Sequence, residues 1–427
     1  MMSNVVFEAL DWVRSTNVYE VNLRQYTKEG TFEAFSREMP RLKDMGVEVL
    51  WFMPITPIAT EQRKGSLGSY YACCDFTSTN PEYGSIDDFR KMVAVAHELG
   101  LKVIIDWVAN HTGWGHSWTK TNPDFFKINE HGHFFDSNGW DDVIDLDFNN
   151  RDMRLALIEA MRFWVRETGI DGFRCDMAML VPLDFWKEAR AELDKERKLF
   201  WLAECEEANY HEAFDATYTW EWMHKTADFC KGNTDINGLD QLLHKYEQHF
   251  VPAAVRMYFT TNHDENSWNG TEYEKYGEAA LAFAVFGATW NGIPMIYSGQ
   301  ELPNKKRLKF FDKDTIEWNG SYQLHEFYKV LLNLRKTNPA LRAGDKEAIT
   351  RRIYTGSNEG LFSFIRKNGN REVLVILNLS ASDTSAISFN REDVSGEFAN
   401  AFSGHLHDFN AEPTINLKGW QYLVFVK

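Results

Sequence analysis

Eight short runs of β-branched and aromatic residues alternate with longer amphipathic stretches over the first three quarters of this chain, and this alternation limits the fold more than any other feature. Parallel strands need long crossover connections, usually helices, and eight strand–helix units are the number that closes a barrel. We therefore predict an α/β fold, a (β/α)8 TIM barrel. Its strands are expected at residues 18–21, 47–53, 102–108, 172–176, 200–204, 214–219, 257–262 and 294–298.

Two other regions interrupt or follow this pattern. Residues 109–150 are rich in Asn, Gly, His, Trp and Asp and are too long for an ordinary connection, so we expect a small inserted domain after strand three. From residue 345 the pattern changes to alternating strands, at 361–366, 372–379 and 420–426, with turns at 367–370. This predicts a C-terminal antiparallel β-sandwich domain over 345–427, with the barrel formed by 1–108 and 151–344. Within the barrel, helices are expected at 31–45 and 86–99, ending near Gly46 and Gly100.

The net charge limits which partners the protein can bind, and the cysteines indicate in which compartment it functions. The chain carries 62 acidic and 46 basic residues, a net charge of -16, which repels phosphate backbones and anionic lipids. Nucleic acid and membranes are therefore excluded as expected partners. The five cysteines show no spacing typical of a disulfide framework or a zinc site, and the N-terminus lacks a secretory pattern. We expect a cytoplasmic protein.

Polar side chains lie at the predicted C-terminal ends of four strands. In a (β/α)8 barrel these ends meet at one mouth, where the chemistry is located. The residues concerned are Asp106, Asn110 and His111 after strand three, Arg174 and Asp176 at strand four, Glu204 at strand five, and His263 and Asp264 at strand seven. Two or more carboxylates in one cleft indicate glycoside hydrolysis, which needs a nucleophile or base and a protonated acid. Arg174 is two residues before Asp176 on a strand, so the two share a face, and the cation favours a negative charge on Asp176.

Several segments resemble, in order, the sequence regions of the α-amylase family of glycoside hydrolases. They are DWVANH (106–111), GFRCDMAML (172–180), WLAEC (201–205) and FTTNHDEN (259–266), together with VIDLDFNN (143–150), GIPMIYSGQE (292–301) and the loop at 69–89. The resemblance covers about residues 18–301. It implies that Asp176 is the nucleophile, that Glu204 is the general acid and then the base, and that Asp264 binds sugar hydroxyls and stabilises the transition state.

The same resemblance assigns further residues. Tyr71 is expected to stack on the distorted sugar, and His111, Arg174 and His263 to bind substrate in the same subsite. Asn110 and Asp145 match residues that bind calcium between barrel and insertion in many members. Calcium is thus the one cofactor predicted, with no organic cofactor.

The function expected from these residues is a retaining hydrolase of α-1,4-glucosidic bonds in starch or maltooligosaccharides, acting as a monomer. An α-glucan transferase, an α-glucosidase or a cyclomaltodextrinase on the same scaffold stays open, because the matching regions do not separate them. The region at strand four departs from many α-amylases, which have Lys-His where this chain has Met179 and Leu180. A binding protein without chemistry is disfavoured, since all three carboxylates are present.

Overall fold

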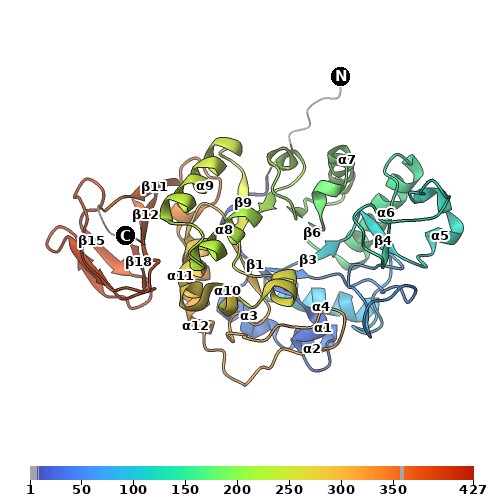
Figure 1. Ribbon diagram of the computed structural model, residues 1–427, viewed down its shortest axis with the longest axis horizontal. Coiled ribbons are helices and arrows are strands. Elements are labelled where there is room, and N and C mark those ends of the chain that lie inside the picture. The colour runs from blue at the N-terminus through green and yellow to red at the C-terminus, as the bar shows by residue number, and fades with distance from the viewer. Residues whose placement is uncertain (1–6, 8, 356–359) are drawn as a thin grey trace.

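A closed barrel of eight parallel strands forms the centre of the molecule, in the computed structural model, which describes residues 7, 9–355 and 360–427 (Figure 1). Around the barrel the order is β1-β10-β9-β8-β7-β6-β3-β2, and the first strand closes on the last, with Val18 opposite Met295. The strands are β1 (Val18–Val21), β2 (Val49–Phe52), β3 (Lys102–Trp107), β6 (Gly172–Cys175), β7 (Phe200–Ala203), β8 (Ala216–Tyr218), β9 (Val255–Tyr258) and β10 (Ile293–Tyr297). The predicted (β/α)8 barrel is confirmed.

Helices connect successive strands and cover the outside of the barrel (Figure 1). They are α1 (Leu23–Tyr26), α2 (Phe32–Ser36), α3 (Met39–Met45), α4 (Ile86–Glu98), α6 (Arg151–Thr168), α7 (Leu183–Leu193), α8 (Trp220–Cys230), α9 (Ile236–His249), α10 (Glu272–Tyr276), α11 (Ala280–Thr289) and α12 (His325–Thr337). Among the described residues, every helix is too short or too polar to cross a bilayer.

Several boundaries differ from the sequence prediction. The single helix expected at 31–45 is wrong: the chain forms α2 and α3, and Pro40 lies in the first turn of α3. Proline has no amide hydrogen to continue a helix from upstream, so the break falls just before it. Gly46 ends α3 with φ +97°, as the expected left-handed cap. Strand seven is also shorter than predicted, because β9 ends at Tyr258 and the chain leaves the sheet before the motif that follows.

The segment between β3 and α6 forms a small unit beside the barrel mouth, far from the C-terminal sheet (Figure 1). Its β4 (His111–Gly113) and β5 (Val143–Asp145) pair antiparallel, and α5 (Trp118–Thr121) lies between them in sequence. Trp118 packs against Phe76 and Phe125, with ring centroids 5.2 and 5.3 Å away. This aromatic cluster fixes the segment to the barrel loops that carry polar residues of the mouth.

The C-terminal region is an antiparallel β structure that packs against α11. One sheet has six strands in the order β11-β12-β13-β18-β15-β16, and β14 pairs with β17. The strands are β11 (Ile349–Ile353), β12 (Leu361–Asn368), β13 (Arg371–Asn378), β14 (Thr384–Ser388), β15 (Glu397–Asn400), β16 (Leu406–Asp408), β17 (Thr414–Leu417) and β18 (Tyr422–Val426). Phe286 and Trp290 at α11 contact Phe362 and Phe364 of β12, with ring centroids 4.8 to 6.0 Å apart.

Two fully buried arginines lie near this junction between the barrel and the C-terminal sheet. Arg335 of α12 donates to the carbonyl oxygens of Arg14 and Thr16, at 3.0 and 3.1 Å. Arg366 of β12 donates to the carbonyl of Arg342 at 2.8 Å. Burial lowers the pKa of each guanidinium to about 9, and the repulsion by Arg366 adds to the effect on Arg335. Their hydrogen bonds connect backbone segments that are distant in sequence.

Candidate active site

A pocket of about 440 Å³ opens at the C-terminal ends of the barrel strands. The three predicted catalytic carboxylates all line it, and so do Tyr71 and His111. The complete lining is Lys64, Ser69, Tyr71, His111, Trp140, Asp142, Val143, Asp176, Met177, Glu204, Asp264, Trp268, Phe310 and Phe311. The strand ends named in the sequence analysis therefore meet at a single cavity.

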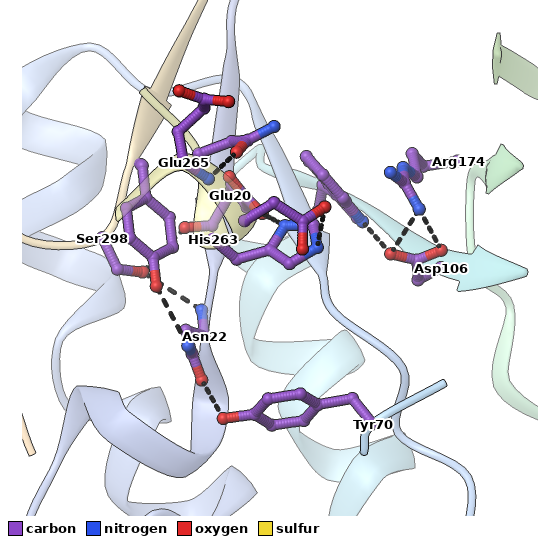
Figure 2. Close-up of polar contacts among 12 residues, drawn as sticks. Glu20, Asn22, Tyr70, Asp106, Arg174, His263, Glu265 and Ser298 are labelled. Atoms are coloured by element: carbon purple, nitrogen blue, oxygen red, sulfur yellow. Dashed lines mark hydrogen bonds and ion pairs between the residues drawn. The ribbon is translucent and has the colours of Figure 1, made fainter. Parts of the chain in front are cut away.

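Arg174 lies beneath this pocket and contacts three carboxylates. Its Nη1 is 2.9 Å from Oδ1 of Asp106 and 2.8 Å from Oδ1 of Asp176, and its Nη2 is 2.7 Å from Oε2 of Glu204. The guanidinium is fully buried, and Figure 2 shows it facing the carboxylate of Asp106. Burial opposes the charge of Arg174, but the acidic groups around it, Asp106 and Glu204 above all, outweigh burial and raise its pKa well above its usual range. One fixed cation thus serves both carboxylates that a retaining glycosidase needs.

Glu204 follows β7 and is held in a position suited to a proton donor. Its Oε2 accepts the backbone N–H of Met177 at 2.8 Å. Met177 itself has φ +38°, a left-handed conformation that a side chain other than glycine adopts only at a cost in free energy. Burial raises the pKa of Glu204 to about 8, and the charges of Asp176 and Asp264 act in the same direction against Arg174. At neutral pH this carboxyl group is therefore protonated.

Asp264 has the opposite charge state, and His263 explains it. Nδ1 of His263 is 2.5 Å from Oε1 of Glu20, and its Nε2 is 3.3 Å from Oδ2 of Asp264. Burial opposes a charge on His263, but Asp264 and Glu20 raise the pKa of the imidazole well above its usual value. Burial likewise raises the pKa of Asp264, yet His263 and Arg174 outweigh it and the net shift is downward. Figure 2 shows His263 and Glu20 side by side.

The predicted substrate-binding residues occupy two layers. Tyr71 and His111 line the pocket, whereas Arg174 and His263 are buried below its wall. The hydroxyl of Tyr71 donates to Oδ2 of Asp106 at 3.1 Å and is 2.7 Å from Nε2 of His263. This fixes the tilt of the Tyr71 ring, which lies nearly parallel to the imidazole at 5.5 Å. The lower layer thus holds the upper one in place.

Sequence reasoning missed several residues of the site. Glu20 is fully buried within β1, and a charged residue inside a barrel strand was a usable signal. Trp268 and Phe310 form an aromatic wall with ring centroids 5.2 Å apart, and Trp268 is 51% exposed. Lys64 pairs with Asp142 at 2.7 Å, joining the loop after β2 to the insertion at the pocket edge. The aromatic wall and the Lys64–Asp142 pair lie outside the barrel strands, where the sequence shows no regular pattern.

The structure brings the two predicted calcium ligands together, but the surroundings do not suit that ion. Nδ2 of Asn110 is 3.4 Å from Oδ1 of Asp145, so the amide nitrogen faces the carboxylate. The other oxygen of Asp145 accepts from Nζ of Lys127 at 2.9 Å and from Oγ and N of Ser137 at 2.5 and 3.2 Å. Calcium takes six to eight oxygen ligands, and a lysine cation beside the only predicted carboxylate opposes it.

Within the described residues, one group of three acidic or histidine side chains has potential ligand atoms within 4.8 Å of one another: Asp44, His325 and Glu326. This cluster belongs to α3 and α12, and Asp44 already binds Lys329 at 2.9 Å. It is separate from the insertion.

The fold and the pocket define a class: a (β/α)8 barrel enzyme with a glycosidase arrangement of carboxylates at the C-terminal mouth. Residues 15–319 match the family model described as the alpha amylase catalytic domain. The chain belongs to the α-amylase family of glycoside hydrolases.

Relatives and solved structures agree with this assignment. The chain is 26% identical to alpha-amylase MalA of Haloarcula japonica, over 92% of this chain and 60% of that protein. It is 27% identical to a cyclomaltodextrin glucanotransferase of Bacillus sp. (strain 1-1), over 88% of this chain and 58% of that protein. The chain thus spans about three fifths of the length of these two relatives.

Two solved structures match over nearly the whole chain. An alpha-amylase from Lactobacillus plantarum gives a TM-score of 0.89 at 28% identity, covering 98% of this chain and 100% of that one. A noncanonic maltogenic alpha-amylase, AmyB from Thermotoga neapolitana, gives 0.89 at 29% identity, covering 98% and 99%. The likeness therefore extends over the barrel, the insertion and the C-terminal sheet.

Proposed function

We propose that this protein hydrolyses α-1,4-glucosidic bonds in starch or maltooligosaccharides and retains the anomeric configuration. The observation that carries the proposal is the pairing of unlike carboxyl groups in one pocket: a protonated Glu204 and, beside it, Asp176 paired with Arg174. Retaining glycosidases need one carboxylic acid for the leaving oxygen and one carboxylate as nucleophile. The pocket supplies both on rigid strand ends.

The reaction divides into two displacements. In the first, Oδ of Asp176 attacks the anomeric carbon while Glu204 gives its proton to the glycosidic oxygen, and the bond to the leaving glucan breaks. In the second, the Glu204 carboxylate takes a proton from water, whose oxygen attacks the anomeric carbon and releases Asp176. Both carboxyl groups return to their starting states, so no external acid or cofactor is consumed.

The remaining residues bind and orient the sugar. Asp264 accepts hydrogen bonds from sugar hydroxyls, and Tyr71 offers a ring face to the sugar bound at the cleaved bond. His111 donates or accepts at a hydroxyl, since burial lowers the pKa of its imidazole and keeps it neutral. Arg174 and His263 act from below by pairing with Asp176 and Asp264. Together these contacts orient the anomeric carbon toward Asp176.

A transferase is the second candidate, because the aromatic wall of Trp268, Phe310 and Phe311 gives an acceptor sugar a surface to stack on. In that reaction a sugar hydroxyl replaces water in the second displacement. An α-glucosidase or a cyclomaltodextrinase would use the same steps on other chain lengths.

The decisive experiment is the time course of products from soluble starch and maltoheptaose, with and without added glucose. We expect short maltooligosaccharides from the wild type and a rate lower by about 10³-fold or more for Glu204→Gln. Glu207→Gln, an exposed glutamate three residues on, is the matched control and should leave the rate unchanged. Products longer than the substrate would support the transferase instead, and equal rates for both variants would remove Glu204 from the mechanism.

A further inference from the structure

Asp145 is a fully buried carboxylate at the junction between the insertion and the barrel. It ends β5 and pairs in register with His111 of β4, whose side chain lines the pocket. A buried carboxylate that is left without a cation or hydrogen-bond donors costs several kcal/mol. The position of Asp145 therefore requires a partner.

The chain supplies this partner from its own sequence. Nζ of Lys127 is 2.9 Å from Oδ2 of Asp145 and 3.5 Å from Oγ of Ser137. The backbone fixes the lysine in place as well, because the N–H of Lys127 donates to the carbonyl of Asp145 at 3.0 Å. The Lys127 side chain is 39% exposed, so its stem reaches in from the surface while Asp145 remains buried.

The remaining hydrogen-bonding capacity of Asp145 is also occupied. Ser137 donates its hydroxyl and its backbone N–H to Oδ2, and Asn110 directs its amide nitrogen at Oδ1. Three donors from two residues, in addition to the ammonium group, bind this carboxylate, so a divalent ion would have to compete with them. A metal would have to displace Lys127 and reverse the Asn110 amide.

We propose that Lys127 takes the place of a calcium ion in this chain: its ammonium group neutralises Asp145 and holds residues 127–137 of the insertion against the paired strands β4 and β5 without a metal. The consequence concerns the pocket, since the strand that Asp145 ends is paired with the strand that carries His111. The insertion and its pocket residues should then be independent of calcium concentration.

The first test measures the wild-type protein. Its melting temperature in excess chelator and in calcium at about 1 mM, near the weak end of protein calcium sites, should agree within about 1 °C. Metal analysis of the purified chain should find far less than one calcium per molecule. A calcium-dependent rise of several degrees, or stoichiometric calcium, would overturn the proposal.

The second test uses Lys127→Met, with Lys120→Met as the matched control on an exposed lysine of the same insertion. Lys127→Met should lower the melting temperature by about 5 °C and speed proteolysis within residues 109–150, because it leaves a buried charge unpaired. Adding Asp145→Asn to Lys127→Met should recover part of this loss, since the uncompensated charge is then gone. Additive losses in the double variant, or a Lys127→Met variant as stable as Lys120→Met, would show that the pair does not fasten the insertion.

Discussion

Arg174 at the barrel mouth and Arg335 at the junction with the C-terminal sheet are both fully buried, yet their surroundings are opposite. Arg174 contacts three carboxylates, whereas Arg335 donates to backbone carbonyls. The pKa of Arg174 is raised by its anionic neighbours and that of Arg335 is lowered to about 9 by burial. An arginine thus pairs with the acidic groups of the pocket in one place and connects backbone segments in the other.

The two arginines therefore serve different purposes: one belongs to the catalytic pocket and the other stabilises the fold. At the mouth, acidic groups of unlike protonation state surround one buried cation, and the backbone is strained, as the left-handed Met177 shows. At the junction, guanidinium groups donate hydrogen bonds to backbone carbonyls, and aromatic rings pack beside them. These contacts stabilise the fold. Substitutions in the two regions should therefore have separable effects.

The largest effect is expected for Arg174→Met. Removing the cation should lower kcat/KM on maltoheptaose by roughly 10³-fold, because Asp176 loses its ion pair and Glu204 its nearest positive charge. The variant should also melt at a lower temperature at pH 8 than at pH 5, since protonation relieves the unpaired carboxylates. A variant with wild-type kcat/KM would remove Arg174 from the site.

Arg335→Met should lower stability and leave activity nearly unchanged. We expect the free energy of unfolding to fall by about 3 kcal/mol, since the carbonyls of Arg14 and Thr16 lose their buried donor. Well below the melting temperature, kcat/KM should change by no more than about twofold, because the mouth is untouched. Chemical denaturation and steady-state kinetics on one preparation check both parts, and a large loss of activity in the folded variant would contradict the separation.

A third prediction concerns the pH dependence of stability, through Glu204. Its pKa is raised from the usual 4.5 to about 8 by burial and neighbouring carboxylates. The folded state therefore binds more protons than the unfolded state between these values, and this contribution to stability is lost as pH rises through about 8. Glutamine does not titrate, so the Glu204→Gln variant does not lose stability in this way. The unfolding free energy of the variant minus that of the wild type should therefore increase from pH 5 to pH 9, by about 2 kcal/mol. Arg335→Met should show a constant difference from wild type between pH 5 and 8.

The smallest effect is expected for Trp268→Ala at the exposed aromatic wall. KM for maltoheptaose should rise about threefold to tenfold through loss of stacking, with kcat and melting temperature little changed. Tyr354→Ala, an exposed aromatic residue in the C-terminal region, is the control and should alter none of these. Equal KM values for the two variants would show that the wall does not bind sugar.

Much of the fold could be predicted because its signals are local. Parallel barrel strands are buried on both faces, so they read as apolar runs, and the topology then places residues after each strand at one mouth. Asp176, Glu204 and Asp264 are brought to one pocket for this reason. The break before Pro40 was missed because the apolar spacing alone was followed.

The rest of the site depends on contacts between distant loops. Leu67 donates its backbone N–H to Phe311 at 2.9 Å, and Ser66 binds Asp312 at 2.6 Å, so the loops after β2 and β10 shape the pocket together. No sequence pattern reports such contacts. The partner of Asp145 was missed for the same reason, because Lys127 is an ordinary charged residue until folding places it.

The pairing of β1 with β10 has a consequence for the synthesis of this protein. Val18 can find Met295 only after most of the barrel has left the ribosome, so the hydrogen-bonding edge of β1 on that side has no partner for most of translation. An open strand edge is a site where chains pair wrongly with one another. Glu20, which lies on β1 and later binds His263, places a charge on that edge strand in the nascent chain. Charged side chains on an open strand edge oppose such pairing.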